Sequence, residues 1–314
     1  MNRELQDRFR GCLLGLAVGD ALGAPVEGWS ADAIRRRYGR LTAMVGGSAL
    51  GRRLGPGETT DDTAMMLCIA RTIAQRRRFD AAEVARRFLA WYDTKPKDIG
   101  STTRVALSLL RQGVPWQEAG RLAHQQLGGQ MAGNGSIMRC APIALLRWRN
   151  EPLLMEESID SSLITHYDPR ACWATVALNL LLVQCLMGHK ERSLAAVALK
   201  VAEPEVRLAV RSAPTLMARA LPNSGFVLDT LQAALWCFLH AESLEEALVA
   251  AVNLGGDADT IGAVCDALAG AYYGAAAIPS RWLSPLRSRD EISELADGIY
   301  SLATPDPPMA RADK

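Results

Sequence analysis

Near its N-terminus the chain reads GCLLGLAVGDALG over residues 11–23, with a glycine at every fourth position from Gly11 to Gly23. Residues four apart share one face of an α-helix, so these glycines predict a ridge without side chains along that face. Each interior glycine destabilises a helix by roughly 1 kcal/mol, so we expect a compensating close contact with another helix. The alternative is that part of this segment is loop, because glycine supports helix poorly.

A second, interrupted glycine stripe lies near the other end of the chain, at Gly262, Gly270 and Gly274. Its spacing again places glycines on one helix face. We therefore expect the two glycine-bearing helices to pack against each other in the centre of the molecule.

Most of the remaining chain also favours helices. Apolar residues recur at helical spacing in seven stretches, which are 67–73, 84–91, 105–110, 173–187, 228–239, 244–252 and 261–273. Alternating runs of β-branched residues bounded by turn signals are nearly absent. The predicted fold class is all-α.

The connections between these stretches predict one compact domain. Turn-rich segments lie at 46–57, 95–101, 128–136, 220–225 and 277–285. None of them is long enough or low enough in complexity to be a domain linker. Residues 304–314, with three prolines, are typical of a disordered end. The prediction is a single domain over residues 1–303 and a flexible C-terminal tail over 304–314.

Composition narrows the functional classes. The chain has 314 residues, 49% of them hydrophobic and 22% charged, with a formal net charge of +1. Such a balance provides no overall field that would draw the protein to nucleic acid or to anionic lipid, so neither partner is expected. The seven cysteines are odd in number and lie mostly in apolar runs. We interpret them as reduced core residues of a cytoplasmic protein.

Two segments have features of membrane or targeting sequences. Arg3, Arg8 and Arg10 precede an apolar stretch as in a signal peptide, but Asp20 interrupts that stretch. Residues 171–188 carry no charge and approach the length of a membrane span. They also contain polar side chains, so we expect a buried core helix there and no membrane attachment.

Two acidic clusters stand at predicted helix starts. Residues 59–63 read TTDDT and residues 255–260 read GGDADT, each directly before an apolar run. A helix start needs only one such residue to cap its free amides, and either cluster alone could be a cap. Two carboxylates in each cluster exceed that need.

Together the clusters predict a metal site. Four converging carboxylates would repel one another and raise their pKa values unless a cation lay between them. Ligands that are all oxygens select a hard ion such as Mg²⁺ or Mn²⁺, and the four scattered histidines do not suggest zinc. Two ions held by four carboxylates would suit a site that binds a diol and activates water.

In these motifs the sequence resembles the ADP-ribosylglycohydrolase family. The resemblance rests on five motifs in the family's order, which are residues 15–23 with Glu27, residues 60–63, residues 133–136 with Met138 and Arg139, Thr165 with His166, and residues 256–260 with Gly262. It implies an orthogonal all-α bundle that holds two Mg²⁺ or Mn²⁺ ions.

The resemblance also implies roles for the acidic residues. The implied metal ligands are Thr60, Asp61, Asp62, Asp257, Asp259 and Thr260. Glu27 matches a glutamate beside the metals that positions or deprotonates water, and Asp62 is the other candidate base. Asp98 matches an aspartate that faces the substrate ribose in nitrogenase-regulating members. Read from the sequence alone, Asp98 could instead be solvated beside a turn and helix cap.

Substrate binding is implied for a further set of residues. They are Gly100, Ser101, Gly133, Asn134, Gly135, Ser136, Met138, His166 and Phe226. The loop at 133–136 would line the ribose and diphosphate, and Phe226 the adenine. Without the resemblance, the loop is only a flexible polar turn, His166 a structural imidazole and Phe226 a core aromatic residue.

The implied reaction is hydrolysis of the bond between ADP-ribose and a protein side chain. Arginine is the favoured acceptor because the bacterial members that the chain most resembles act on it, while serine-linked ADP-ribose and O-acetyl-ADP-ribose are alternatives. A second hypothesis is an inactive binding protein, which the retained aspartates and threonines of both clusters oppose. A third is an immunity protein that neutralises a cognate ADP-ribosyltransferase.

Overall fold

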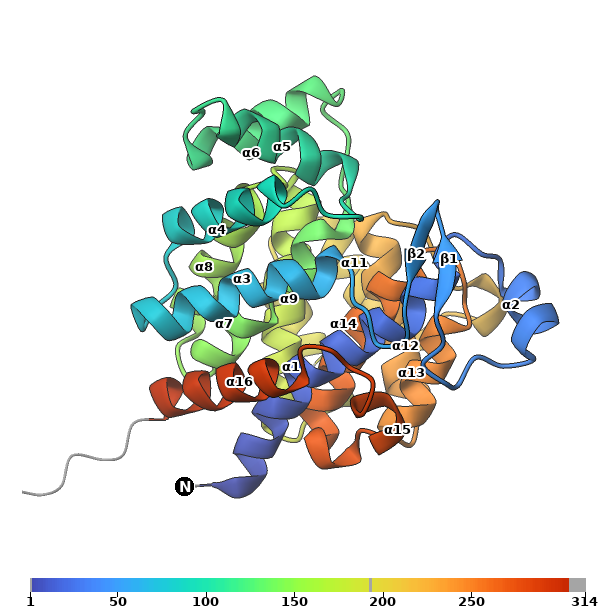
Figure 1. The fold of residues 1–314 in the computed structure, drawn as a ribbon. Coiled ribbons are helices and arrows are strands. Elements are labelled where there is room, and N and C mark those ends of the chain that lie inside the picture. Colours follow the sequence, from blue (N-terminus) through green and yellow to red (C-terminus); the bar gives the residue numbers. More distant parts are fainter. Residues whose placement is uncertain (1, 192–193, 305–314) are drawn as a thin grey trace, which may run out of the picture.

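The computed structural model describes residues 2–191 and 194–304, and helices dominate this part of the chain (Figure 1). All of the predicted flexible tail except Thr304 lies outside the described residues. With η marking a short 3₁₀ helix, the elements are α1 (Arg3–Gly23), η1 (Ala24–Val26), α2 (Ala31–Tyr38), β1 (Gly47–Ala49), β2 (Arg52–Leu54), α3 (Asp61–Arg76), α4 (Ala81–Asp93), α5 (Ser101–Arg111), α6 (Trp116–Gln126), η2 (Asn134–Arg139), α7 (Ala141–Leu146), α8 (Glu151–Leu163), α9 (Pro169–Leu186), α10 (Leu194–Lys200), α11 (Pro204–Ser212), η4 (Ala213–Thr215), η5 (Ala218–Ala220), α12 (Val227–His240), α13 (Leu244–Val252), α14 (Ala258–Tyr273), η6 (Ala275–Ala277), α15 (Ser280–Leu283) and α16 (Arg289–Ala303).

The all-α prediction is confirmed. All seven periodic stretches fall in helices, namely α3, α4, α5, α9, α12, α13 and α14, and only α9 stops one residue short of the predicted end. The predicted turn at 46–57 contains a feature that the sequence analysis missed, the antiparallel hairpin of β1 and β2, with Ala49 opposite Arg52. Strands of three residues are too short to show an alternating pattern.

The two glycine stripes meet as predicted. Helix α1 is continuous from Arg3 to Gly23, so the loop alternative is wrong. It runs antiparallel to α14 through the middle of the molecule (Figure 1), because Gly11 faces Gly270 while Gly23 faces Ala258. A Cβ atom on Gly19 would lie 2.2 Å from the carbonyl oxygen of Gly262. Backbone therefore touches backbone along this junction, and no larger residue fits.

The interruption in the second stripe is Asp266. Its side chain is fully buried beside Gly15, and neither carboxylate oxygen has a hydrogen-bond partner among the described residues. Burial raises the pKa of Asp266 well above its usual range. Burial in the helix junction therefore favours the neutral, protonated form of this group.

Two helices are long and apolar enough to cross a membrane by length and composition alone. They are α1 extended to Val26 and α9, and the fold buries 94% and 78% of their apolar windows, respectively. The expectation of a buried core helix at 171–188 is thus confirmed for α9. All seven cysteines are also buried and unpaired.

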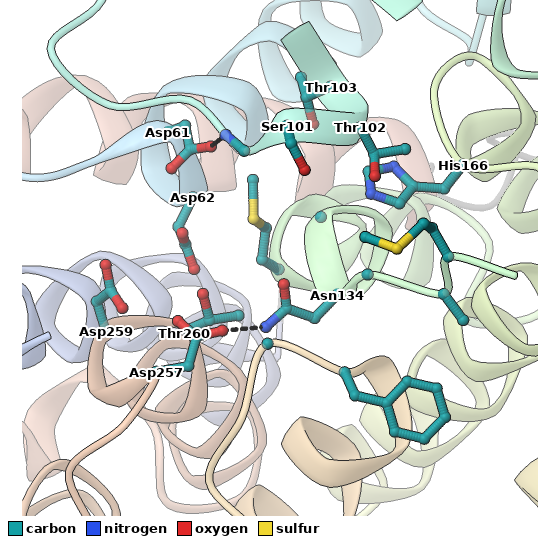
Figure 2. Close-up of a pocket in the computed structure, with 18 of the residues that line it drawn as sticks. Asp61, Asp62, Ser101, Thr102, Thr103, Asn134, His166, Asp257, Asp259 and Thr260 are labelled. Carbon is teal, nitrogen blue, oxygen red and sulfur yellow. Dashed lines mark hydrogen bonds between the residues drawn. The ribbon is translucent and has the colours of Figure 1, made fainter. Parts of the chain in front are cut away.

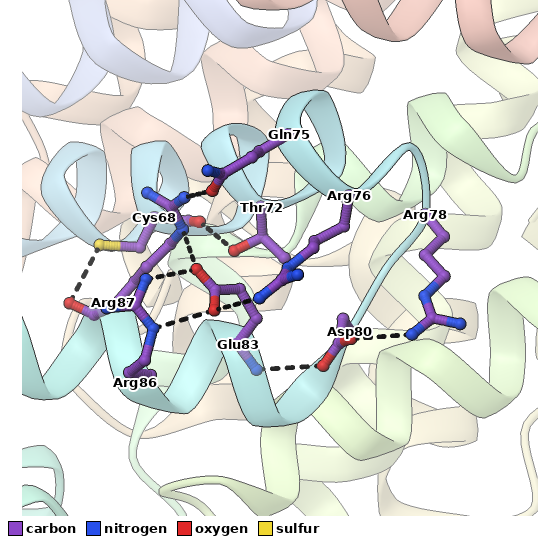
Figure 3. Close-up of polar contacts among 9 residues, drawn as sticks. All are labelled: Cys68, Thr72, Gln75, Arg76, Arg78, Asp80, Glu83, Arg86 and Arg87. Carbon is purple, nitrogen blue, oxygen red and sulfur yellow. Dashed lines mark hydrogen bonds and ion pairs between the residues drawn. The ribbon is translucent and has the colours of Figure 1, made fainter.

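The C-terminal end of α3 is tied to α4 by an ion-pair cluster around the buried carboxylate of Glu83 (Figure 3). Glu83 on α4 pairs with Arg76 of α3 and with Arg86 and Arg87 of its own helix. Asp80 caps α4 by accepting from the backbone N–H of Glu83 at 3.1 Å. These contacts anchor the end of α3 that lies far from its acidic start.

Helices α5 and α6 form a separate unit at one edge of the molecule (Figure 1). They enclose a small apolar cluster of their own, made of Ala106, Leu109, Ala119 and Ala123. The first turn of α5, which begins at Ser101, reaches back toward the acidic start of α3.

Candidate active site

Three helix ends meet at one place: the C-terminal end of α1 and the N-terminal ends of α3 and α14. Asp20 of α1 accepts hydrogen bonds from the backbone N–H groups of Thr60 at 3.0 Å and Thr63 at 3.1 Å. It also accepts from the hydroxyl of Thr63 at 2.6 Å. One turn beyond Gly19, Gly23 packs against Ala258 at the start of α14. Helix α1 therefore sets the distance between the two acidic clusters.

The clusters face one cavity (Figure 2). Its volume is about 470 Å³, within the usual range for small-molecule sites. Its lining combines Glu27, Asp61, Asp62, Asp98, Gly100, Ser101, Thr102, Thr103, Gln130, Met131, Ala132, Gly133, Asn134, Gly135, Met138, His166, Gly225, Phe226, Asp257, Asp259 and Thr260. Residues more than two hundred positions apart in the sequence thus share one site.

The carboxylates are buried together, which disfavours their charged forms. Asp62 and Asp259 are nearly inaccessible, and their pKa values rise well above the usual range because of desolvation and then because of neighbouring carboxylates. Desolvation likewise raises the pKa of Asp61, and it raises that of Asp20 to about 6 against the hydrogen bonds that Asp20 accepts. A cation between these groups would reverse the effect.

The loops at Gly100 and Asn134, which were predicted to bind substrate, each donate a hydrogen bond to an aspartate of the acidic clusters. The backbone N–H of Gly100 donates to Asp61 Oδ2 at 3.3 Å, and Asn134 Nδ2 donates to Asp257 Oδ2 at 2.6 Å. Asn134 Nδ2 also lies 2.8 Å from the Thr230 hydroxyl oxygen. Movement of either loop would therefore change the hydrogen bonds that Asp61 or Asp257 accepts.

The donor set fits a hard divalent cation. One carboxylate oxygen from each of Glu27, Asp257 and Asp259 lies within 4.8 Å of the others. Within the described residues, Asp62 Oδ1 and Asp259 Oδ1 are buried and have no hydrogen-bond partner. Grouped carboxylate oxygens are the ligands that Mg²⁺ and Mn²⁺ prefer, and at Asp62 Oδ1 and Asp259 Oδ1 no described residue competes for the oxygen.

Glu27 is held in place from two sides. The residues after Glu27 form two backbone hydrogen bonds with the turn that precedes α14. Gly28 N donates to Gly256 O and Gly256 N donates to Trp29 O, both at 2.7 Å. Its side chain pairs with Arg52 of the hairpin, and the same guanidinium pairs with Asp98. Arg52 therefore links two carboxylates that line the cavity.

The predicted substrate-binding residues also line the cavity, with one exception. The hydroxyl of Ser136 donates to the carbonyl of Ala171 on α9 at 3.3 Å, and its side chain is fully buried away from the cavity. Of the predicted metal ligands, Thr60 is the one outside the cavity lining. It caps α3, and its hydroxyl donates to Asp62 Oδ2 at 3.2 Å.

His166 lines the cavity as a neutral imidazole. Its side chain is buried, and desolvation followed by the nearby charge of Arg139 lowers its pKa to about 3. Gly135 must be a glycine here, because a Cβ on it would lie 2.6 Å from the imidazole Cε1.

Sequence reasoning missed Asp20 and Arg52 as parts of this site. Asp20 carried a usable signal, since a lone carboxylate in an apolar helix needs a partner. Arg52 carried none, because its partners Glu27 and Asp98 are distant in sequence and the hairpin was not predicted. Thr102, Thr103 and the segment 130–132 also line the cavity without having been singled out.

The fold and the cavity define an all-helical protein with an acidic, small-molecule-binding centre. A family model described as ADP-ribosylglycohydrolase matches residues 1–308. The chain belongs to the ADP-ribosylglycohydrolase family. A solved structure described as an ADP-ribosylglycohydrolase-related protein complex is similar over 96% of this chain and 100% of its own, with a TM-score of 0.82 and 40% identity.

Several characterised relatives match over nearly the whole chain. The ADP-ribosylarginine hydrolase Tri1 of Pseudomonas putida is 34% identical over 306 residues, which cover 95% of this chain and 79% of the relative. The ADP-ribosyl-[dinitrogen reductase] glycohydrolase of Rhodospirillum rubrum is 34% identical over 308 residues, 96% and 98% of the two chains. ADP-ribosylhydrolase ARH3 of Danio rerio is 28% identical over 340 residues, 94% and 90% of the two chains.

Proposed function

We propose that this protein is a metal-dependent hydrolase that removes ADP-ribose from an arginine side chain of a modified protein. The observation that carries the proposal is the convergence of two acidic helix starts on one cavity, with buried carboxylate oxygens that lack partners among the described residues. Two Mg²⁺ or Mn²⁺ ions would be held by Thr60, Asp61, Asp62, Asp257, Asp259 and Thr260. The buried, unpaired cysteines support action in the cytoplasm.

In this proposal, Glu27 and Asp98 handle protons and orientation. Bound divalent ions would supply Lewis acidity toward the ribose hydroxyls and a water molecule. Glu27 accepts a proton from the attacking water as the water oxygen bonds to the anomeric carbon. The bond from that carbon to the arginine nitrogen breaks, so the side chain leaves as a neutral guanidine, which takes up the proton to become guanidinium. Asp98 faces the same cavity and orients the leaving guanidinium. Arg52 holds both carboxylates in position.

Arginine as the acceptor is supported by two kinds of observation. The relatives in Pseudomonas putida and Serratia proteamaculans are named ADP-ribosylarginine hydrolases, at 34% and 32% identity. Glu27 and Asp98 line the cavity and are carboxylates, the groups that accept a guanidinium, and in this structure the guanidinium paired with them is that of Arg52.

A side-by-side assay tests the acceptor. The protein is incubated in Mg²⁺ with equal amounts of a peptide ADP-ribosylated on arginine, a peptide ADP-ribosylated on serine, and O-acetyl-ADP-ribose. We expect release of ADP-ribose from the arginine peptide at least tenfold faster than from either other substrate. Preference for serine or for O-acetyl-ADP-ribose would replace the acceptor, and no release from any substrate would refute the activity.

Chelation tests the metal. The protein is stripped with a chelator and then supplied with Mg²⁺, Mn²⁺ or Zn²⁺. Because the proposed ligands are all oxygens, activity should disappear on stripping and return with Mg²⁺ or Mn²⁺. Full activity in the stripped protein, or rescue by Zn²⁺ alone, would contradict the metal assignment.

A further inference from the structure

Two of the sequence motifs, Arg139 and Thr165 with His166, meet behind the cavity. Thr165 Oγ1 lies 2.8 Å from Arg139 Nη2 on one side and 2.8 Å from His166 Nδ1 on the other. All three side chains are buried. The contacts form a chain from a guanidinium, through a hydroxyl, to an imidazole that lines the cavity.

The donors and acceptors in this series of hydrogen bonds can be assigned by counting hydrogens. A guanidinium only donates, so the Thr165 oxygen accepts from Arg139. The threonine hydroxyl has one hydrogen to give, and within the described residues His166 Nδ1 is its acceptor. If Nδ1 carried the proton instead, the buried hydroxyl hydrogen would have no acceptor, which is unfavourable. Nδ1 therefore accepts, and the imidazole proton resides on Nε2.

The Nε2 edge of the ring faces the loop that lines the cavity. Cβ atoms built on Gly133 and Gly135 would lie 3.4 Å and 3.0 Å from Nε2, respectively. Among the described residues, Nε2 has no hydrogen-bond partner in the protein, while Nδ1 has Thr165. The donor on Nε2 is thus the polar group that the neutral His166 offers to a bound molecule, in a cavity whose charged lining residues are carboxylates.

Arg139 has little other reason to be buried as a cation. It is fully buried, and within the described part of the chain it makes no ion pair. It donates to the carbonyl of Ser161 at 3.0 Å and stacks over the ring of Phe88 at 4.6 Å. A buried cation without a paired anion is costly, which points to a role beyond packing. Its charge also opposes a second positive charge on His166.

We propose that Arg139 and Thr165 are positioning residues that hold His166 in its neutral Nε2–H tautomer, so that Nε2–H donates to an oxygen of bound ADP-ribose. The ligand in this statement rests on the proposed function. The tautomer rests only on the contacts of the free protein. An Nε2 without its hydrogen would instead point a lone pair at an oxygen-rich ligand, which is repulsive.

The tautomer can be observed directly in the wild-type protein. Nitrogen-15 NMR of the histidine ring distinguishes a protonated from an unprotonated ring nitrogen through chemical shifts and long-range couplings. We expect His166 to show an unprotonated Nδ1 and a protonated Nε2 in the ligand-free protein at pH 7. A protonated Nδ1 would overturn the proposal whatever the enzyme's substrate is.

Matched variants of Thr165 test the consequence for binding. Thr165→Val preserves shape but removes the hydroxyl, while Thr165→Ser preserves the hydroxyl. We expect Thr165→Val to mix the two tautomers and to weaken ADP-ribose binding about tenfold in calorimetry, roughly the effect of one hydrogen bond. Thr165→Ser should stay within about twofold of wild type.

Metal binding separates this role from a general structural one. Thr165→Val should leave Mn²⁺ affinity unchanged, because Thr165 does not line the acidic clusters. A Thr165→Val protein that keeps the wild-type tautomer and ADP-ribose affinity would overturn the positioning role of Thr165. Failure of the wild-type protein to bind ADP-ribose would instead refute the proposed function and the ligand assignment, with the NMR result still reporting the tautomer.

Discussion

Buried carboxylates lie near both ends of α3, but their surroundings have opposite effects on their pKa values. At the C-terminal end, Glu83 is surrounded by three arginines, and the hydrogen bond from Arg86 is the main reason that its pKa falls to about 2 (Figure 3). At the N-terminal end, Asp61 and Asp62 face other carboxylates, make no ion pair with a described Lys or Arg, and have raised pKa values. The chain neutralises a carboxylate where it serves only structure. At the cavity no described Lys or Arg does so for Asp61 and Asp62, and in the proposed function a bound metal ion would take that role.

The largest effect should come from adding one methyl group to the α1–α14 junction, one turn before the end of α1 that borders the cavity. In Gly19→Ala the new Cβ meets the Gly262 carbonyl, which is backbone and cannot rotate away. We expect the free energy of unfolding to fall by about 3 kcal/mol or more and the metal-induced rise in melting temperature to shrink. Urea denaturation with and without Mg²⁺ measures both.

Gly298→Ala is the matched control for Gly19→Ala. Gly298 lies within α16, and a Cβ built there meets nothing within 4 Å. The same substitution should therefore stabilise the protein by up to about 1 kcal/mol through helix propensity. If Gly19→Ala behaved like Gly298→Ala, the close-packed junction would not be what positions the site.

Removing a carboxylate at the cavity should stabilise the metal-free protein. The folded pKa of Asp62 lies above the unfolded value of about 3.9, so this group destabilises the metal-free fold increasingly as pH rises above about 4. Asp62→Asn and Asp259→Asn should therefore gain about 1–2 kcal/mol over wild type at pH 8 in a chelator, and nothing near pH 4. Mg²⁺ should stabilise wild type but not the variants. Equal metal-induced shifts in wild type and a variant would remove that aspartate from the ligand set.

The opposite pH dependence is expected at the other end of α3. The folded pKa of Glu83 lies near 2, below the unfolded value of about 4.3, so its stabilisation is present above pH 4 and disappears as pH falls toward 2. Glu83→Gln should lower the melting temperature at pH 7, less than Gly19→Ala does, and match wild type near pH 2. Glu294→Gln, at an exposed position of α16, should change little at either pH. A Glu83→Gln protein as stable as wild type at pH 7 would contradict the ion-pair role.

The smallest effect is expected from Asp266, whose buried carboxylate in the α1–α14 junction has no hydrogen-bond partner among the described residues. Its raised pKa means that wild type loses stability as pH increases above about 4. Asp266→Asn should raise the free energy of unfolding at pH 8 by up to about 1 kcal/mol and leave Mn²⁺ affinity unchanged. A change in Mn²⁺ affinity beyond threefold would show that Asp266 acts on the proposed metal site.

The sequence predicted the parts of the site that depend on local spacing. Four glycines at every fourth position predicted a close helix contact, and the structure places Gly19 against Gly262. Two acidic clusters predicted a shared site, and Asp62 and Asp259 line one cavity. These patterns are readable because each lies within one helix or helix start. Spacing within one segment does not usually show which helices pack together, but here the two glycine stripes predicted that pairing.

The missed parts depend on tertiary contacts that leave no local pattern. Arg52 reaches Glu27 and Asp98 only because an unpredicted hairpin folds over η1. Ser136 lies in the predicted loop but turns toward α9, since the direction of a side chain in a 3₁₀ turn depends on what packs behind it. Asp20 was visible in the sequence, but its partners on α3 were not.

The antiparallel pairing of α1 with α14 also affects how the protein is made. Helix α1 finds its partner only after residues 258–273 have been synthesised, more than two hundred positions later. At about 5–20 residues per second, that is a wait of roughly 10 to 50 s. During this time the apolar, glycine-striped α1 is without its main contact surface. Native contacts of such high sequence separation predict slow folding. The cavity between the two acidic clusters should therefore be among the last parts of a newly made chain to form, after α3 and α4 have joined through Glu83.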